Sequence, residues 1–466
     1  MEYRETIREA YVEGGLVRGI RAGNPVYTVF KGIPYAAPPV GTLRWKAPQP
    51  VVPWEGTRLC CEYGNIAEQT IRYGEPLYGR EFFENIDPRG EDCLYLNIWT
   101  PAKSAEDKLP VLFWIHGGGF FGGSGSEPEF DGEGFCRRGV ILVTINYRLG
   151  AIGFLAHPEL SAENDRGVSG NYGLLDQIAA FHWVRNNIAA FGGDPDRITV
   201  AGQSAGARSV QCLMTSALCK DELAGAIIQS TADVGPGRFG KAPTLAEAEQ
   251  QGIQFMKNFG CADIQQLRQI PAAELMASQT LAFSGMRFGP ITDGYVQEEA
   301  SGMAILEGRY PDIPYICGNT GDEGGLDSLD LFSRIHQVLS AGNMAFCENH
   351  ERLGRKPVYA YNFSHPLPGD EMGAFHAGEL WYEFETLNRC WRPFTGVDYD
   401  IAVTMASYFA NFVKRGDPNG EGLPVWEGYT AGKRQCMNLS EETGMTDVPV
   451  TEKYLKKMES LKKLMA

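Results

Sequence analysis

The sequence predicts an α/β protein built on a large, mostly parallel central sheet that is flanked by helices. Short runs of apolar and β-branched residues recur along the 466-residue chain and alternate with longer segments of helical pattern. These runs are apolar throughout, which is typical of parallel strands that are buried on both faces. Hydrophobic residues make up 43% of the chain, enough for a large core. No repeat or linker divides residues 1–466, so we expect a single domain.

The first clear strands are expected at residues 110–115 (PVLFWI) and 139–147 (GVILVTINY). Residues 171–191 are rich in Leu, Ile and Ala, contain no proline and end at a turn over 192–195, which predicts a helix. A helix of this length is the expected crossover between parallel strands. Further strands are expected at 198–202, 224–230, 314–319 and 357–363.

Two segments are not assigned to the sheet. Residues from about 236 to 285 look helical and mixed in polarity, and residues from about 326 to 356 form the second segment. We expect both to be helical cap or side insertions beside the sheet.

The charge balance limits the partners of this chain. A formal net charge of −16, with no Lys/Arg-rich run, argues against nucleic acid and membrane surfaces. Residues 1–15 contain no apolar stretch, so we expect no signal peptide or anchor and a soluble, cytoplasmic protein. A monomer or loose homodimer is the base-rate expectation.

Eleven cysteines are scattered without a CxxC pair, so we expect reduced thiols and no metal site. The one candidate bridge joins Cys93 to Cys60 or Cys61, and an intracellular location disfavours it.

The segment Gly202-Gln203-Ser204-Ala205-Gly206 matches the G-x-S-x-G nucleophile elbow directly after a predicted strand. Glycines two positions on either side of the serine are expected because larger side chains would collide with backbone in so tight a turn. The serine would then lie at the N-terminus of the following helix, whose dipole favours developing negative charge. Ser204 is therefore the candidate nucleophile.

A glycine run supplies the second part of the candidate site. His116-Gly117-Gly118-Gly119-Phe120 follows a predicted strand, and glycines let backbone N–H groups approach a substrate oxyanion closely. We expect Gly118, Gly119 and Ala205 to be the oxyanion donors. The alternative interpretation is a plain flexible turn between strand and helix.

Recognisable blocks run along nearly the whole chain in one order, and together they resemble the type-B carboxylesterase and lipase family, which includes cholinesterases and bacterial para-nitrobenzyl esterases. Besides HGGGF, the matching blocks are FKGIPYAAPPVGTLRW (30–45), GEDCLYLNIWTP (90–101), NYRLGAIGF (146–154), residues 171–206, GNTGDEGG (318–325), GAFHAGEL (373–380) and NFVKRGDPN (411–419).

The resemblance implies the α/β-hydrolase fold and supplies the other two members of a catalytic triad. The family's acid falls on Glu323 and its histidine on His376, in the chain order serine, acid, histidine. Asp322 is a rival for the acid, and either carboxylate could instead satisfy backbone donors of its loop. We expect structural roles for His116 and His182.

The family pattern also suggests two scaffold ion pairs, Arg44 with Glu91 and Arg148 with Asp176.

The sequence departs from the family at Gln203, where glutamate is usual. We expect the loss of this negative charge to lower the pKa of His376 relative to a glutamate-bearing enzyme. Residues 62–90 contain no tryptophan, which disfavours a choline-ester specialist. Aromatic residues that are candidates for lining a substrate pocket are Phe120, Phe121, Trp381, Tyr382 and Phe384.

The resemblance implies a serine carboxylesterase that acts on small to medium esters through an acyl-enzyme and needs no cofactor. Two other classes remain open. One is a non-catalytic adhesion or scaffold protein, although Ser204, Glu323 and His376 are all retained. The other is hydrolysis of amides or thioesters by the same triad, which motifs cannot separate from ester hydrolysis.

Overall fold

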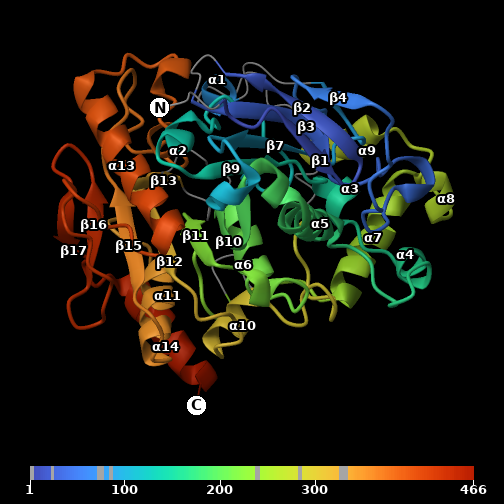
Figure 1. The fold of residues 1–466 in the computed structure, drawn as a ribbon. Helices are drawn as coiled ribbons and strands as arrows, with labels where there is room; N and C mark the ends of the chain where they lie inside the picture. The colour runs from blue at the N-terminus through green and yellow to red at the C-terminus, as the bar shows by residue number, and fades with distance from the viewer. Residues whose placement is uncertain are drawn as a thin grey trace.

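The computed structural model describes residues 5–22, 26–70, 78–82, 88–236, 242–281, 286–324 and 334–465. Within these ranges a 13-stranded mixed sheet forms the centre of the molecule, in the order β1-β2-β3-β7-β9-β8-β10-β11-β12-β15-β16-β17, with β4 paired to β2 (Figure 1). The strands are β1 (Glu9–Val12), β2 (Gly15–Arg21), β3 (Thr28–Pro34), β4 (Thr57–Cys60), β7 (Tyr95–Thr100), β8 (Leu109–Ile115), β9 (Ile141–Ile145), β10 (Gly193–Gln203), β11 (Gly225–Gln229), β12 (Tyr315–Thr320), β15 (Val358–Phe363), β16 (Gln435–Leu439) and β17 (Gly444–Asp447).

The stretch of the sheet from β9 to β16 is parallel throughout, and antiparallel strands complete it at both ends. All six strands predicted from sequence lie in this stretch, as β9, β8, β10, β11, β12 and β15, so the predicted fold class is confirmed. Two small sheets lie apart from it: β5 (Ile66–Ala67) with β6 (Arg89–Gly90), and β13 (Asp322–Gly324) with β14 (Arg334–His336).

The predicted helix over 171–191 is α5 (Tyr172–Asn187), followed by a 3-10 turn, Ile188–Phe191. The turn expected at 192–195 is shorter than predicted. Gly192 takes φ +80°, but Gly193 already pairs with Leu109, and the register shifts before Ile198.

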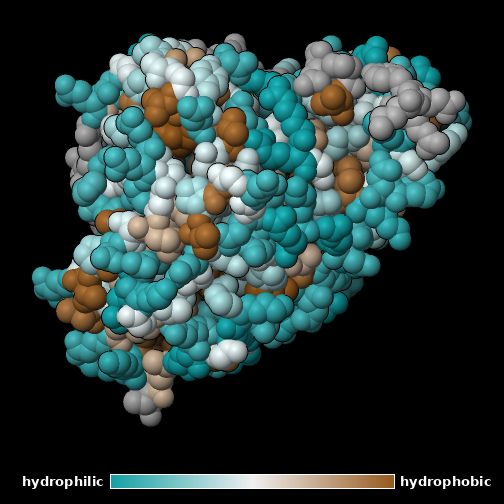
Figure 2. Space-filling model, turned by 60° about the vertical axis from the view of Figure 1, so that its left-hand side comes forward, coloured by the Kyte–Doolittle hydropathy of each residue, from teal (hydrophilic) through white to brown (hydrophobic). Residues whose placement is uncertain are grey.

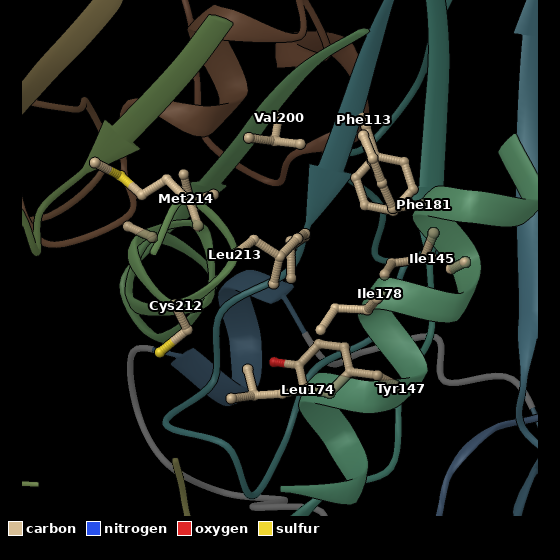
Figure 3. Close-up of a cluster of buried hydrophobic side chains, with 14 of the residues drawn as sticks. Phe113, Ile145, Tyr147, Leu174, Ile178, Phe181, Val200, Cys212, Leu213 and Met214 are labelled. Atoms are coloured by element: carbon tan, nitrogen blue, oxygen red, sulfur yellow. The ribbon is translucent and has the colours of Figure 1, made fainter. Parts of the chain in front are cut away.

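Helices cover both faces of the sheet. Successive side chains of β8 point to opposite faces, and both sets are apolar and buried. Val111, Phe113 and Ile115 face α5 and α6 (Ala205–Leu213), whereas Leu112 and Trp114 face α2 (Glu133–Arg137) and α13 (Gly396–Arg415). Figure 3 shows the first of these layers, in which Phe113 of β8 and Val200 of β10 meet Phe181 and Ile178 of α5 and Leu213 of α6. Burial on both faces explains why these strands are apolar without alternation.

The remaining helices lie around this frame: α1 (Tyr78–Phe82), α3 (Gly150–Phe154), α4 (Pro158–Ala162), α7 (Leu245–Asn258), α8 (Ile264–Leu267), α9 (Ala272–Leu281), α10 (Ser301–Leu306), α11 (Ala341–Arg352), α12 (Leu380–Glu383) and α14 (Glu452–Met465).

The two expected insertions differ from each other. The described part of 236–285 is helical, as α7, α8 and α9. The described part of 326–356 holds the strand β14 as well as α11, because residues 334–336 pair with β13. Parts of these expected insertions, or of their edges, lie outside the described residues: 237–241, 282–285 and 325–333.

One face of the surface is drawn by hydropathy in Figure 2. The face drawn in Figure 2 is mostly hydrophilic, and hydrophobic residues occur there in separate patches. No helix in the described ranges is long and apolar enough to cross a bilayer. Cys60, Cys61 and Cys93 are free thiols.

Candidate active site

Ser204 lies on a sharp turn between β10 and α6. Its backbone takes φ 56° and ψ −120°, an uncommon conformation for a residue with a side chain, and its N–H donates to Gln229 O at 2.9 Å. A Cβ at Gly202 would lie 2.5 Å from Gly206 C, and a Cβ at Gly206 would lie 2.0 Å from Ile115 O. The two glycines of the motif are thus sterically required, as the sequence predicted.

The glycine loop after β8 lies against this elbow. A Cβ at Gly117 would be 2.9 Å from Gln203 O and 3.4 Å from Ser204 Cβ. Gly118 and Gly119 take φ +95° and φ +65°, which side chains disfavour. Among the described residues, the N–H groups of Gly118, Gly119 and Ala205 donate no backbone hydrogen bond. Donors of this kind are available to a substrate oxygen beside Ser204.

His376 and Glu323 are in direct contact, although 53 residues separate them along the chain. His376 Nδ1 lies 2.5 Å from Glu323 Oε2, and Glu323 Oε1 accepts from Thr320 N at 3.2 Å. Glu323 is 2% exposed. Burial by itself raises the pKa of Glu323, but the charge and hydrogen bond of His376, together with further hydrogen bonds that include the one from Thr320 N, hold this pKa below its usual value.

Asp322, the rival acid, points elsewhere. Its Oδ2 accepts from Ala374 N at 2.9 Å and its Oδ1 lies 3.2 Å from His336 Nδ1. Its own N–H donates to Ala374 O, so Asp322 ties β13 to the segment that carries His376. Only Glu323 of the two carboxylates contacts the His376 imidazole among the described contacts.

Gln203 contacts the imidazole from the elbow. Its buried side-chain nitrogen lies 3.2 Å from His376 Nε2 and 3.5 Å from Nδ1. If Nδ1 donates its proton to Glu323, Nε2 is the acceptor, and the Gln203 amide donates to it. The Gln203 amide thus lies in contact with the imidazole, and its expected effect on His376 stays a prediction.

Sequence reasoning missed a group of buried acids near this site. Glu379 is fully buried, both carboxyl oxygens lack a hydrogen-bond partner in the described structure, and burial, followed by the charge of Glu323, raises its pKa to about 8. Glu383 is also fully buried and accepts from Gln229 Nε2 at 2.8 Å. The sequence did hold a signal for Glu379, because this residue follows His376 by three positions in the block GAFHAGEL.

The expectation that Trp381, Tyr382 and Phe384 line a pocket is wrong. All three are at most 1% exposed, because α12 packs them into the core against α13 and α2. Trp381 Nε1 donates to Glu81 and Tyr382 OH donates to Asp398, so their polar atoms are satisfied there. Phe121 is 40% exposed, and Phe120 is half-buried against Phe154.

The two scaffold ion pairs are present. Arg44 binds both carboxylate oxygens of Glu91 at 2.6 and 2.5 Å, and Arg148 binds both oxygens of Asp176 at 2.7 Å in a fully buried pair.

His116 and His182, for which structural roles were expected, both contact neighbouring side chains of the scaffold. His116 is buried and stacks on Tyr147, with ring centroids 4.4 Å apart, while His182 lies on α5 with its imidazole 3.7 Å from Glu222.

This fold, with a serine elbow, a facing glycine loop and a histidine–acid contact, defines the α/β-hydrolase class. The chain also matches the carboxylesterase family over residues 6–338 and 327–458. It therefore belongs to the type-B carboxylesterase family and is a carboxylic ester hydrolase.

Individual relatives share nearly the whole chain. It is 43% identical to fumonisin B1 esterase of Sphingopyxis macrogoltabida, over 93% of this chain and 86% of that protein. It is 34% identical to para-nitrobenzyl esterase of Bacillus subtilis (strain 168), over 92% of this chain and 94% of that protein. Among solved structures, a thermophilic para-nitrobenzyl esterase aligns with a TM-score of 0.82 and 30% identity, over 97% of this chain and all of that one.

Proposed function

We propose that this enzyme is a serine carboxylesterase that hydrolyses small to medium carboxylic esters through Ser204, His376 and Glu323. The observation that carries the proposal is the 2.5 Å contact between His376 Nδ1 and Glu323 Oε2, next to a Gln203–Ser204 elbow that also touches the imidazole. These contacts support a triad in which Ser204 is the nucleophile, His376 the general base and Glu323 the orienting acid.

The mechanism is acyl transfer in two steps. Ser204 Oγ attacks the ester carbonyl while His376 Nε2 exchanges the Gln203 amide for the serine hydroxyl and accepts its proton, and Glu323 stabilises the imidazolium through Nδ1. The N–H groups of Gly118, Gly119 and Ala205 stabilise the oxyanion, and His376 then protonates the leaving alcohol. Water repeats the sequence on the acyl-enzyme and releases the acid.

The test is hydrolysis of a para-nitrophenyl ester series, from acetate to decanoate, by the native protein and Ser204→Ala side by side. We expect activity in the native protein that falls to background in Ser204→Ala, and the chain-length optimum gives the size of the acyl pocket. Equal activity in both proteins would remove Ser204 from its role. A para-nitroanilide and a thioester of the optimal acyl group, assayed in parallel, separate ester hydrolysis from amide and thioester hydrolysis.

A second candidate substrate comes from the relative that is 43% identical, which is named for fumonisin B1. We include fumonisin B1 as a substrate beside the nitrophenyl esters. Release of hydrolysed product by the native protein but not by Ser204→Ala would support this narrower function, and a lack of product would leave general esterase activity in place.

We also propose that the enzyme acts in the cytoplasm as a monomer or loose homodimer, without a nucleic-acid partner. The net charge of −16, which repels polyanions, supports the absence of a nucleic-acid partner. Light scattering of the purified protein gives the oligomeric state, and a filter-binding assay with duplex DNA at low salt should detect no retention.

A further inference from the structure

Two acidic side chains, Glu127 and Glu129, lie behind the glycine loop. Glu127 Oε1 accepts from Ser124 N at 2.6 Å, and the carboxyl of Glu129 lies beside that of Glu127. Glu129 is 1% exposed, and its Oε2 has no partner among the described residues. Two adjacent carboxylates repel each other when both are ionised, so a proton on one member stabilises the pair.

The groups that face this pair in the described structure supply no compensating positive charge. They are His116, Tyr147, Glu81 and the pair itself. Burial lowers the pKa of His116 to about 4 and raises that of Tyr147, so both are neutral at physiological pH, while Glu81 is already paired with Arg392 at 2.8 Å. Burial first, and then the neighbouring carboxylate for Glu129, raise the pKa of both glutamates, as for other carboxyl pairs that cannot both ionise.

The pair is connected to the loop by close contacts. A Cβ at Gly123 would lie 2.5 Å from His116 Nδ1 and 3.1 Å from Glu127 Oε1, so the Glu127 carboxyl packs directly behind Gly123. One residue earlier, Gly122 N donates to Gly118 O at 3.1 Å, and a Cβ at Gly118 would meet Gly122 O at 2.1 Å. A displacement of Glu127 would therefore move Gly123, and through the closed turn from Gly118 to Gly122 it would also move Gly118.

We propose that Glu127 and Glu129 are positioning residues that share one proton and hold the N–H groups of Gly118 and Gly119 in place for the oxyanion. This inference rests on the proposed catalytic role of that loop. When the shared proton is lost, two adjacent carboxylates repel each other, Glu127 leaves Ser124, and the donors are misaligned. Because the donors act on the developing oxyanion, kcat falls more than KM changes.

The test compares the alkaline limbs of kcat in the native enzyme, Glu129→Gln and the exposed control Glu421→Gln, on para-nitrophenyl butyrate. In Glu129→Gln the new side-chain amide donates to Glu127 at every pH, so we expect the alkaline limb of kcat to be displaced upward by more than about one pH unit, with each limb measured relative to the same enzyme's own kcat at neutral pH. Glu421→Gln should keep the native limb. Identical limbs in the native enzyme and Glu129→Gln, or a pH effect on KM alone, would overturn the proposal.

A second readout does not depend on catalysis. Hydrogen–deuterium exchange of the peptide over residues 118–125 is followed against pH in Ser204→Ala and in Ser204→Ala with Glu129→Gln, after correction for intrinsic exchange. We expect the loop to lose protection at alkaline pH in the first protein and to keep it in the second. Equal protection in both overturns the proton-sharing pair, whereas full esterase activity of Ser204→Ala would instead overturn the proposed function.

Discussion

His376 Nδ1 lies 2.5 Å from Glu323 Oε2, while the neighbouring Asp322 is bonded to the backbone of Ala374. We therefore expect Glu323→Gln to lower kcat by on the order of 10³- to 10⁴-fold, because an amide no longer fixes the imidazole tautomer or stabilises the imidazolium. Asp322→Asn is the matched control and should lose far less activity. Steady-state kinetics decide between them, and equal losses in both variants would contradict the assignment of Glu323.

Gln203→Glu tests the departure from the family at the elbow. The Gln203 amide lies 3.2 Å from His376 Nε2, and a carboxylate in its place would stabilise the protonated imidazole. We expect the acidic limb of kcat/KM to move to higher pH, since the base then takes its proton at a higher pH. Superimposable acidic limbs in the two enzymes would show that residue 203 does not influence the base.

Gly118→Ala tests the glycine loop. Gly118 has φ +95° and an added Cβ would meet Gly122 O at 2.1 Å, so the backbone that carries the expected oxyanion donors must move. We expect kcat to fall by about 10²- to 10³-fold, as on loss of one oxyanion donor. Gly139→Ala is the control, because Gly139 has φ +75° with nothing within 4 Å. If both variants lose activity alike, backbone strain rather than the contact is responsible.

The buried ion pair of Arg148 and Asp176 should contribute strongly to the free energy of unfolding. Both side chains are fully buried, so Asp176→Asn leaves a charge without its partner and should cost about 3–5 kcal/mol of unfolding free energy. Glu452→Gln, which breaks the exposed Glu452–Lys456 pair, should change stability little. Urea unfolding followed by tryptophan fluorescence measures both, and a small loss in Asp176→Asn would contradict the burial of this pair.

Glu379 should make stability depend on pH. Its folded pKa is raised to about 8 by burial, above the unfolded value, so its contribution is fully present below about pH 4 and is lost as pH rises through about 8. We expect Glu379→Gln to gain stability relative to the native protein between these limits, by at most about 1.4 kcal/mol per pH unit. Urea midpoints at a series of pH values test this, and a pH-independent difference would show that Glu379 is ionised in the folded state.

The sequence by itself determined the features that depend on contiguous residues. The six strands of the parallel sheet follow from apolar runs that are buried on both faces, and the elbow follows from glycines that must sit two positions from Ser204 to avoid backbone atoms. The glycine loop after β8 could be predicted from the sequence for the same reason. In each case the physical constraint acts within a few residues, so the pattern along the chain carries it.

The tertiary structure alone decided the relationships between distant segments. Asp322 and Glu323 are adjacent in sequence, and only the pairing of β13 with the His376 segment separates their roles. Trp381 and Phe384 were expected in a pocket but lie in the core, because their exposure depends on how α12 packs against α13. The burial of Glu129 and Glu379, and hence their raised pKa values, likewise depends on neighbours that the local sequence does not specify.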